Sequence, residues 1–152
     1  MKIAIASDHA GYSLKQDLIA YLKELGHEVI DLGTNSEDSV DYPDFAKKMA
    51  EEITAKSGER GILICGTGIG MSIAANKYNG VRAALCLFPE MAELSRKHNN
   101  ANVLVLAGRL MGTELARWVV KKFLETDFEG GRHARRVKKI EENPLEQGES
   151  HK

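Results

Sequence analysis

Short apolar runs alternate along the chain with longer segments whose apolar positions recur every three or four residues. The short runs are typical of buried strands and are expected at 3–6, 29–32, 61–65, 81–88 and 102–107. The longer segments predict helices at 14–25, 43–53, 71–77, 89–98, 112–124 and 132–142. Because a helix follows each strand, the pattern predicts a doubly wound α/β fold. Its five-stranded parallel sheet would lie in a three-layer, Rossmann-like α/β/α sandwich that carries a C-terminal helix.

The chain has 152 residues, which fits one domain at the usual size of roughly 150 residues. We expect that domain to cover residues 1–142. Residues 143–152 are almost all polar, which predicts a flexible C-terminal tail.

Charge and composition argue against several classes of partner and ligand. Lys and Arg total 21 against 22 Asp and Glu, a balance that argues against nucleic acid as a general partner. No apolar run approaches the roughly 20 residues that span a bilayer, and no signal-peptide pattern opens the chain, so we expect a cytoplasmic protein without a membrane partner. Two cysteines cannot form a disulfide framework, and no C-x-x-C spacing suggests a metal site, so no metal is expected.

Polar residues at the strand ends are the candidates for chemistry, because ligands bind there in doubly wound folds. The first strand runs into Ser7-Asp8-His9 and lacks the G-x-G-x-x-G motif, which argues against a nicotinamide or flavin cofactor. Asp8 and His9 offer a carboxylate and an imidazole side by side. Alternatively, Asp8 caps the following helix and His9 is a loop residue.

A glycine-rich turn follows the third strand, and a helix is expected from about Met71. Backbone N–H groups in such a turn can hold a phosphate or a developing oxyanion. A plain tight turn is the alternative. The residues of this turn are Gly66, Thr67, Gly68, Ile69 and Gly70.

Cys65 ends the strand before this turn. A thiol in front of a helix N-terminus has an increased thiolate fraction and could act as a nucleophile or a base. It could equally be a small buried apolar residue, which is how we interpret Cys86 within the fourth strand.

His98 lies between a helix and the fifth strand and is an acid–base candidate. The alternative is a C-terminal helix cap, with Asn99 or Asn100 in the left-handed conformation. Arg109 follows the fifth strand. Arg132 and Arg136 share one face of the last helix and suit a phosphate dianion, unless they simply form a solvated basic surface.

These candidates suit proton transfer next to a carbonyl. They comprise a thiol, two imidazoles, a carboxylate, an anion-binding turn and several arginines. Over residues 1–142 the sequence resembles the ribose-5-phosphate isomerase B family, which includes galactose-6-phosphate isomerase subunits. The resemblance rests on the order and spacing of several segments. They are 7–11, 41–43, 61–70, 72–77, 95–99 and 130–133.

The resemblance implies cofactor-free interconversion of ribose 5-phosphate and ribulose 5-phosphate through an enediolate, in the non-oxidative pentose phosphate pathway. Cys65 would be the base that moves the proton between C1 and C2, and His98 the acid that opens the furanose ring. Asp8 would assist at the ring oxygen or hydroxyls. The turn from Gly66 to Gly70, with Thr67, would hold the enediolate oxygen. Some members carry a Glu base on the following helix, where this chain has no acid.

The remaining contacts are also implied by the resemblance. His9, Arg132 and Arg136 would hold the phosphate, with Arg109 nearby, and Asn99 and Tyr42 would make further contacts with the substrate. In the family the site lies between two subunits, so a homodimer or homotetramer is implied.

Two alternatives remain. One is an isomerase of a hexose 6-phosphate, such as allose or galactose 6-phosphate. The galactose-6-phosphate enzymes need two different subunits, whereas this chain carries both Cys65 and His98. The other is a non-catalytic phosphosugar-binding module of flavodoxin-like architecture, which would leave the joint presence of Cys65, His98 and Asp8 unexplained.

Overall fold

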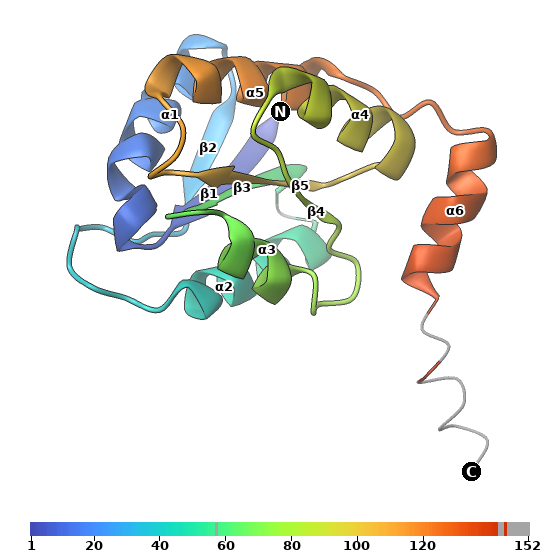
Figure 1. Ribbon diagram of the computed structural model, residues 1–152, viewed down its shortest axis with the longest axis horizontal. Helices are drawn as coiled ribbons and strands as arrows, with labels where there is room; N and C mark the ends of the chain where they lie inside the picture. Colours follow the sequence, from blue (N-terminus) through green and yellow to red (C-terminus); the bar gives the residue numbers. More distant parts are fainter. Residues whose placement is uncertain (57, 143–144, 146–152) are drawn as a thin grey trace.

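Five parallel strands form the centre of the computed structural model, which describes residues 1–56, 58–142 and 145 (Figure 1). The strand order is β2-β1-β3-β5-β4, and the register pairs Ile5 with Ile62 and Leu63 with Val105. The predicted five-stranded doubly wound sheet is therefore confirmed. The strands are β1 Lys2–Ser7, β2 Glu28–Asp31, β3 Arg60–Cys65, β4 Ala83–Leu85 and β5 Val103–Ala107.

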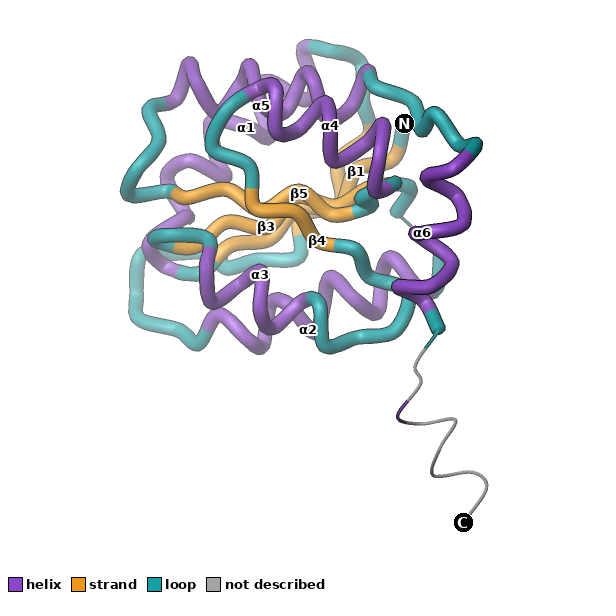
Figure 2. Tube along the Cα trace, turned by 45° about the vertical axis from the view of Figure 1, so that its right-hand side comes forward, coloured by secondary structure: helices purple, strands orange, loops and turns teal. Residues whose placement is uncertain are grey.

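Helices cover both faces of the sheet. One layer contains α1, α4 and α5, the other contains α2 and α3, and α6 stands apart from both (Figure 2). A short 3-10 helix, His9–Gly11, precedes α1. The α-helices are α1 Tyr12–Glu24, α2 Tyr42–Thr54, α3 Ile69–Ala75, α4 Pro89–Asn99, α5 Thr113–Glu125 and α6 Arg132–Glu141.

Each face of the sheet has its own apolar core, because successive side chains of a strand point to opposite faces. In β1, Ile3 and Ile5 pack under α1 and α5, whereas Ala4 and Ala6 pack under α2 and α3. Complete burial of one large aliphatic side chain contributes about 1.5–3 kcal/mol. The nearly continuous apolar sequence of the strands thus follows from burial on both faces.

Left-handed residues follow the ends of two helices. Gly26 (φ 88°) closes α1, where its N–H donates to the Lys23 carbonyl and the N–H of His27 donates to that of Leu22. This pair of bonds satisfies carbonyls that the helix leaves open. Asn100 (φ 47°) ends α4 in the same conformation, as the capping interpretation of this segment expected.

The fourth strand is shorter than predicted. The apolar run 81–88 suggested a long strand, but the ladder with β5 covers only Ala83–Leu85, because burial of Val81 and Cys86 extends the apolar run beyond the strand. Cys86 is therefore outside the strand, although it is buried as expected. The helix expected over 71–77 begins at Ile69 and ends at Ala75.

The predicted flexible tail, residues 143–152, lies outside the described residues except for Leu145. Among the helices that are described, none combines the length and the apolar character needed to cross a membrane.

Candidate active site

The carboxyl ends of β1, β3 and β5 meet at one edge of the sheet, because the three strands are neighbours. Main-chain hydrogen bonds join the loops that follow them. The N–H of Asp8 donates to the Ile64 carbonyl at 3.1 Å, and the N–H of Gly108 donates to the Cys65 carbonyl at 2.8 Å. This carboxyl edge therefore brings together Asp8, Cys65 and Arg109, which are far apart in sequence.

Cys65 is the last residue of β3, and its side chain is only 4% exposed. It belongs to the apolar core under α2 and α3, next to residues such as Ala6 and Met71. The burial fits both interpretations of this cysteine, since a base that must work in a water-poor site and a plain apolar residue would both be covered. Its position directly before the glycine turn is what favours chemistry.

The glycine turn presents unused backbone donors. In the described part of the chain, the N–H groups of Gly66, Thr67 and Gly68 donate to no backbone or side-chain acceptor. The hydroxyl of Thr67 accepts from the N–H of Ile69 at 3.2 Å and so shapes the turn from within. Free N–H groups beside a thiol form the kind of cradle that stabilises a developing oxyanion.

Glycine is required at position 68 of this turn. Gly68 has φ +77°, and an added Cβ would stand 2.5 Å from Leu85 Cδ1 and 3.2 Å from the Leu106 carbonyl oxygen. At Gly66 an added Cβ would stand 3.3 Å from Arg109 Cδ, so the side chain of Arg109 lies directly against the turn. Gly68 thus allows close contact of the turn with β4 and β5, and Gly66 leaves room for Arg109.

The capping interpretation of Asp8 is confirmed. Its Oδ1 accepts from the N–H groups of Ala10 at 3.0 Å and Gly11 at 3.1 Å, which fixes the carboxylate at the carboxyl edge. The described contacts leave Oδ2 without a partner, so the cap does not prevent a second role. The neighbouring His9 accepts from the N–H of Val40 at its Nδ1 (3.2 Å), which leaves Nε2 to face other groups.

Tyr42 begins α2 and lies against the first turn of α3. An added Cβ at Gly70 would stand 2.6 Å from Tyr42 Cζ, so the ring uses the space that glycine leaves. This contact holds the phenol beside the helix that follows the glycine turn, as a substrate contact at Tyr42 requires.

His98 and Asn99 lie at the opposite edge of the sheet. Helix α4 runs antiparallel to the strands and ends just before β5 begins, so its last turn lies where the strands start, at the amino edge. The six residues of β3 span roughly 20 Å at the usual rise per residue. One chain therefore separates His98 from Cys65 by about the length of a strand.

Arg132 and Arg136 accompany His98 at the amino edge. Both are exposed and lie one turn apart on α6, which stands on the side of the molecule where α4 ends (Figure 1). The predicted shared helical face is confirmed by this spacing. The expected grouping of these arginines with His9 and Arg109 is not present within one chain, because His9 and Arg109 lie at the carboxyl edge.

His98 and His133 form a stacked pair at the amino edge, which the sequence did not predict. The rings of His98 and His133 stack with centroids 4.3 Å apart and planes 15° apart, and Glu129 Oε2 lies 4.0 Å from His133 Nε2. Burial, followed by the positive charge of His98 and Arg132, lowers the pKa of His133, and Glu129 opposes this shift. No sequence spacing connects His98 with residues so much later in the chain.

These three side chains have the right types to bind a metal ion, and one ligand atom from each lies within 4.8 Å of the others. The lone pair of an imidazole nitrogen lies in the plane of its ring. Stacked rings therefore direct their lone pairs within two nearly parallel, separated planes, which do not favour convergence on one ion. The arrangement of His98 and His133 is that of packed rings and does not form a ready metal centre.

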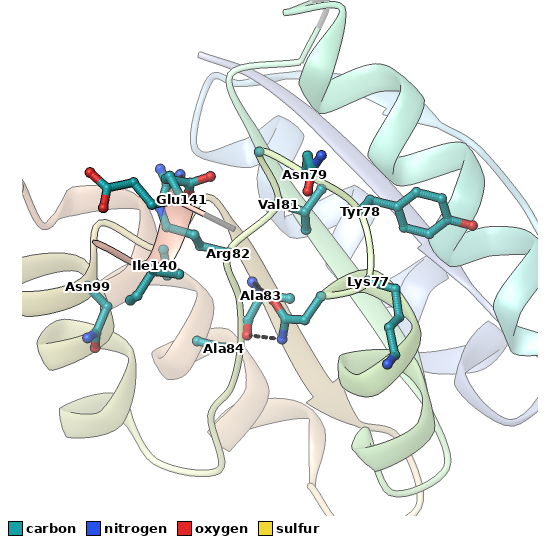
Figure 3. A pocket seen from close by; sticks show the side chains of 14 residues that line it. Lys77, Tyr78, Asn79, Val81, Arg82, Ala83, Ala84, Asn99, Ile140 and Glu141 are labelled. Carbon is teal, nitrogen blue, oxygen red and sulfur yellow. Dashed lines mark hydrogen bonds and ion pairs between the residues drawn. The ribbon is translucent and has the colours of Figure 1, made fainter. Parts of the chain in front are cut away.

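A pocket of about 620 Å³ lies beside this cluster, between α6 and the α3–β4 connection (Figure 3). Asn99 and Glu141 line one side and Lys77 and Tyr78 the other. Arg82 and Glu141, which both line the pocket, form an ion pair at 2.5 Å. The pocket contains Asn99 but none of the carboxyl-edge residues, so it is separate from the surroundings of Cys65.

Known proteins have sequences similar to that of this chain. The family model described as Ribose/Galactose Isomerase matches residues 3–140. Ribose-5-phosphate isomerase B of Escherichia coli K12 is 49% identical over 139 residues, which cover 91% of this chain and 93% of that protein.

Solved structures agree with the sequence matches. A ribose 5-phosphate isomerase from Thermotoga maritima is 63% identical with a TM-score of 0.92, covering 93% of this chain and 98% of that one. Ribose-5-phosphate isomerase B from Mycoplasma genitalium, solved with bound ribulose-5-phosphate, is 46% identical with a TM-score of 0.88, covering 92% and 93% of the two chains. The chain belongs to the ribose/galactose isomerase family.

Proposed function

We propose that the protein is an aldose–ketose isomerase that interconverts D-ribose 5-phosphate and D-ribulose 5-phosphate through a cis-enediolate. The observation that carries the proposal is Cys65 at the end of β3, directly before a turn with free N–H groups. The relatives named ribose-5-phosphate isomerase B and the structure with ribulose-5-phosphate support this substrate. The reaction would serve the non-oxidative pentose phosphate pathway.

The chemistry requires a proton to move between two neighbouring carbons. The Cys65 thiolate takes the proton from C2 of the open-chain aldose, and the electrons move onto the carbonyl oxygen at C1 to give the enediolate. The proton of the C2 hydroxyl moves to O1, and the same thiol returns a proton to C1 as the carbonyl forms at C2, so no net oxidation occurs and no cofactor is consumed. A positioned base contributes roughly 10²–10⁴-fold to such a rate.

The glycine turn would stabilise the charge that appears during this transfer. The N–H groups of Gly66, Thr67 and Gly68 donate to no acceptor among the described residues, so no existing bond has to break when the oxyanion forms. Each such donor is worth about 3–4 kcal/mol in the transition state. Asp8, fixed by its cap, would use its free oxygen at a substrate hydroxyl or at the ring oxygen.

The ring of ribose 5-phosphate must open before the proton can move, and we assign this step to His98. A sugar phosphate is far shorter than the strand that separates Cys65 from His98 in one chain. We therefore propose that the active site forms between two copies of the chain. The carboxyl edge of one copy would supply Cys65 and His9, and the amino edge of the other His98, Asn99 and the arginines of α6.

Exposed apolar side chains support this assembly. Ile69 and Ile73 on α3 and Phe88, Met91 and Leu94 at α4 are all between 44% and 61% exposed. These helices adjoin the two edges that the proposed site requires. A second copy would remove this surface from water and exclude water from the enediolate.

The first experiment is a rate measurement on ribose 5-phosphate, with and without EDTA, beside allose 6-phosphate and galactose 6-phosphate. We expect rapid turnover of the pentose that EDTA does not change, and slower turnover of the hexoses. Preference for a hexose would reassign the substrate within the family. A folded protein that binds sugar phosphates without converting any of them would identify a binding module.

A further inference from the structure

At the amino edge, the ring of His133 stacks on the ring of His98, the proposed acid for ring opening. His133 lies in the first turn of α6 and is 7% exposed, whereas the other described residues of that helix are exposed or half-buried. Its ring covers one face of the His98 ring at a centroid distance of 4.3 Å. The buried side chain of an otherwise exposed helix is thus placed against His98.

The segment before α6 is held in place by α4, which also carries His98. The N–H of Glu129 donates to the Lys97 carbonyl at 3.2 Å. The buried Arg96 donates through Nε to the Thr126 carbonyl at 3.1 Å and through a terminal nitrogen to the Ala101 carbonyl at 2.6 Å. The bonds to Glu129 and Thr126 hold the segment before α6 against α4, so the stacking does not depend on an unsupported loop.

His133 is suited to orientation and unsuited to proton transfer. Its pKa is lowered from 6.5, first by burial and then by the charges of His98 and Arg132, and this shift favours the neutral imidazole. A neutral flat ring can hold a neighbouring imidazole in one plane without taking part in its proton exchange. His98, at the end of a helix and half-exposed, would otherwise have several orientations available.

We propose that His133 is a positioning residue that fixes the plane of the His98 imidazole for opening of the furanose ring. This inference rests on the proposed isomerase function. Misplacement of a catalytic group by as little as 1 Å can cost on the order of 10²-fold in rate. The contact of His133 with His98 is therefore expected to matter for kcat, whereas the phosphate contacts should govern KM.

The test compares His133→Ala with His133→Phe, which keeps a flat ring in the same place. We expect His133→Ala to lower kcat for ribose 5-phosphate by about 10- to 100-fold with little change in KM. His133→Phe should restore most of the lost rate. His27→Ala, which removes a histidine far from this cluster, is the matched control and should behave like the wild-type protein.

A second measurement isolates ring opening. Ribulose 5-phosphate is always open, because its C5 oxygen carries the phosphate and cannot close a five-membered ring. Exchange of its C1 proton for deuterium in D₂O therefore reports enediolate formation without ring opening. His133→Ala should retain this exchange at nearly the wild-type rate while its turnover of ribose 5-phosphate falls.

Three outcomes would overturn the inference. They are unchanged turnover in His133→Ala, no recovery in His133→Phe, and a loss of C1 exchange as large as the loss of turnover. The last would show a general structural effect, which a thermal melt of each variant would reveal independently. If the wild-type protein itself does not convert ribose 5-phosphate, the proposed function fails first, and the two failures are distinguishable.

Discussion

At the scale of single residues, the two cysteines of the chain differ in their surroundings. Cys86 is buried, and burial raises its pKa to about 11 despite an opposing hydrogen bond with Ser95. A thiol with that pKa is protonated throughout the neutral range, and only the thiolate reacts with alkylating reagents. Cys65 instead lies beside free N–H groups at the carboxyl edge.

This difference predicts selective alkylation. Iodoacetamide at pH 8 should inactivate the enzyme by labelling Cys65, as peptide mass spectrometry would show, and ribose 5-phosphate should protect against it. Cys86→Ala should be inactivated at the same rate as the wild-type protein. Labelling of Cys86 as fast as Cys65, or resistance of Cys86→Ala, would contradict the assignment.

Replacement of the proposed base gives a second prediction. Cys65→Ala should lower kcat by roughly 10²–10⁴-fold, because the positioned base is lost. Binding of ribose 5-phosphate, measured by calorimetry, should change little, since the phosphate and hydroxyl contacts remain. A variant that keeps near-normal kcat would show that another group moves the proton.

At the scale of elements, the turn between β3 and α3 depends on a glycine at position 68. Gly68→Ala combines a left-handed conformation with a contact of 2.5 Å to Leu85, so we expect a loss of about 2–4 kcal/mol of unfolding free energy. The activity should fall further, because the N–H groups would move. Gly112→Ala, where an added Cβ meets nothing within 4 Å, is the matched control and should cost below about 1 kcal/mol. Equal effects of the two changes in urea unfolding would refute the steric argument.

A buried ion pair joins α1 to the end of β2. The side chain of Lys15 is fully buried, and its Nζ lies 2.6 Å from Asp31 Oδ1, which also accepts from the N–H of Gly33. Removal of one partner leaves the other charge without compensation, and the cost is larger when the remaining charge is the buried one.

Asp31→Ala should therefore be more destabilising than Lys15→Met. We expect a loss of about 2–3 kcal/mol for Asp31→Ala, below the usual cost of breaking a buried pair because Asp31 is partly exposed. Lys15→Met removes the buried charge together with its need for a partner, and its methyl thioether keeps most of the packing. Denaturant unfolding of both variants provides the comparison, and a larger loss for Lys15→Met would reverse the interpretation.

The elements show which features a sequence can reveal. The strands are continuous apolar runs because both of their faces are buried, and this pattern predicts the sheet and its carboxyl edge. The extent of β4 was overestimated, because Val81 and Cys86 are buried outside the strand, where Cys86 adds one bond from its N–H to the Val105 carbonyl. The His98–His133 stack was missed, since it depends on how the last helix packs on α4 and leaves no periodic signal.

At the scale of the whole molecule, the candidate residues divide between opposite edges of the sheet. The carboxyl edge holds Cys65 and Asp8, and the amino edge holds His98 and Arg136. The sequence could not show this division, because it follows from the antiparallel course of α4 beside the parallel strands. Ring opening and proton transfer on one small sugar nevertheless need residues from both edges. A two-fold symmetric dimer would bring the carboxyl edge of each chain to the amino edge of the other and so form two sites.

Such a dimer predicts complementation between two inactive variants. In a mixed dimer of Cys65→Ala and His98→Asn, one site carries both substitutions, while the other combines an intact Cys65 with an intact His98. Random pairing would place half of the chains in mixed dimers with one good site each, so about one quarter of the wild-type rate should return. Coexpression with two affinity tags would isolate the mixed species and avoid dependence on subunit exchange. If each chain instead built its own site, every site in the mixture would lack one group, and the coexpressed protein would remain as inactive as the separate variants.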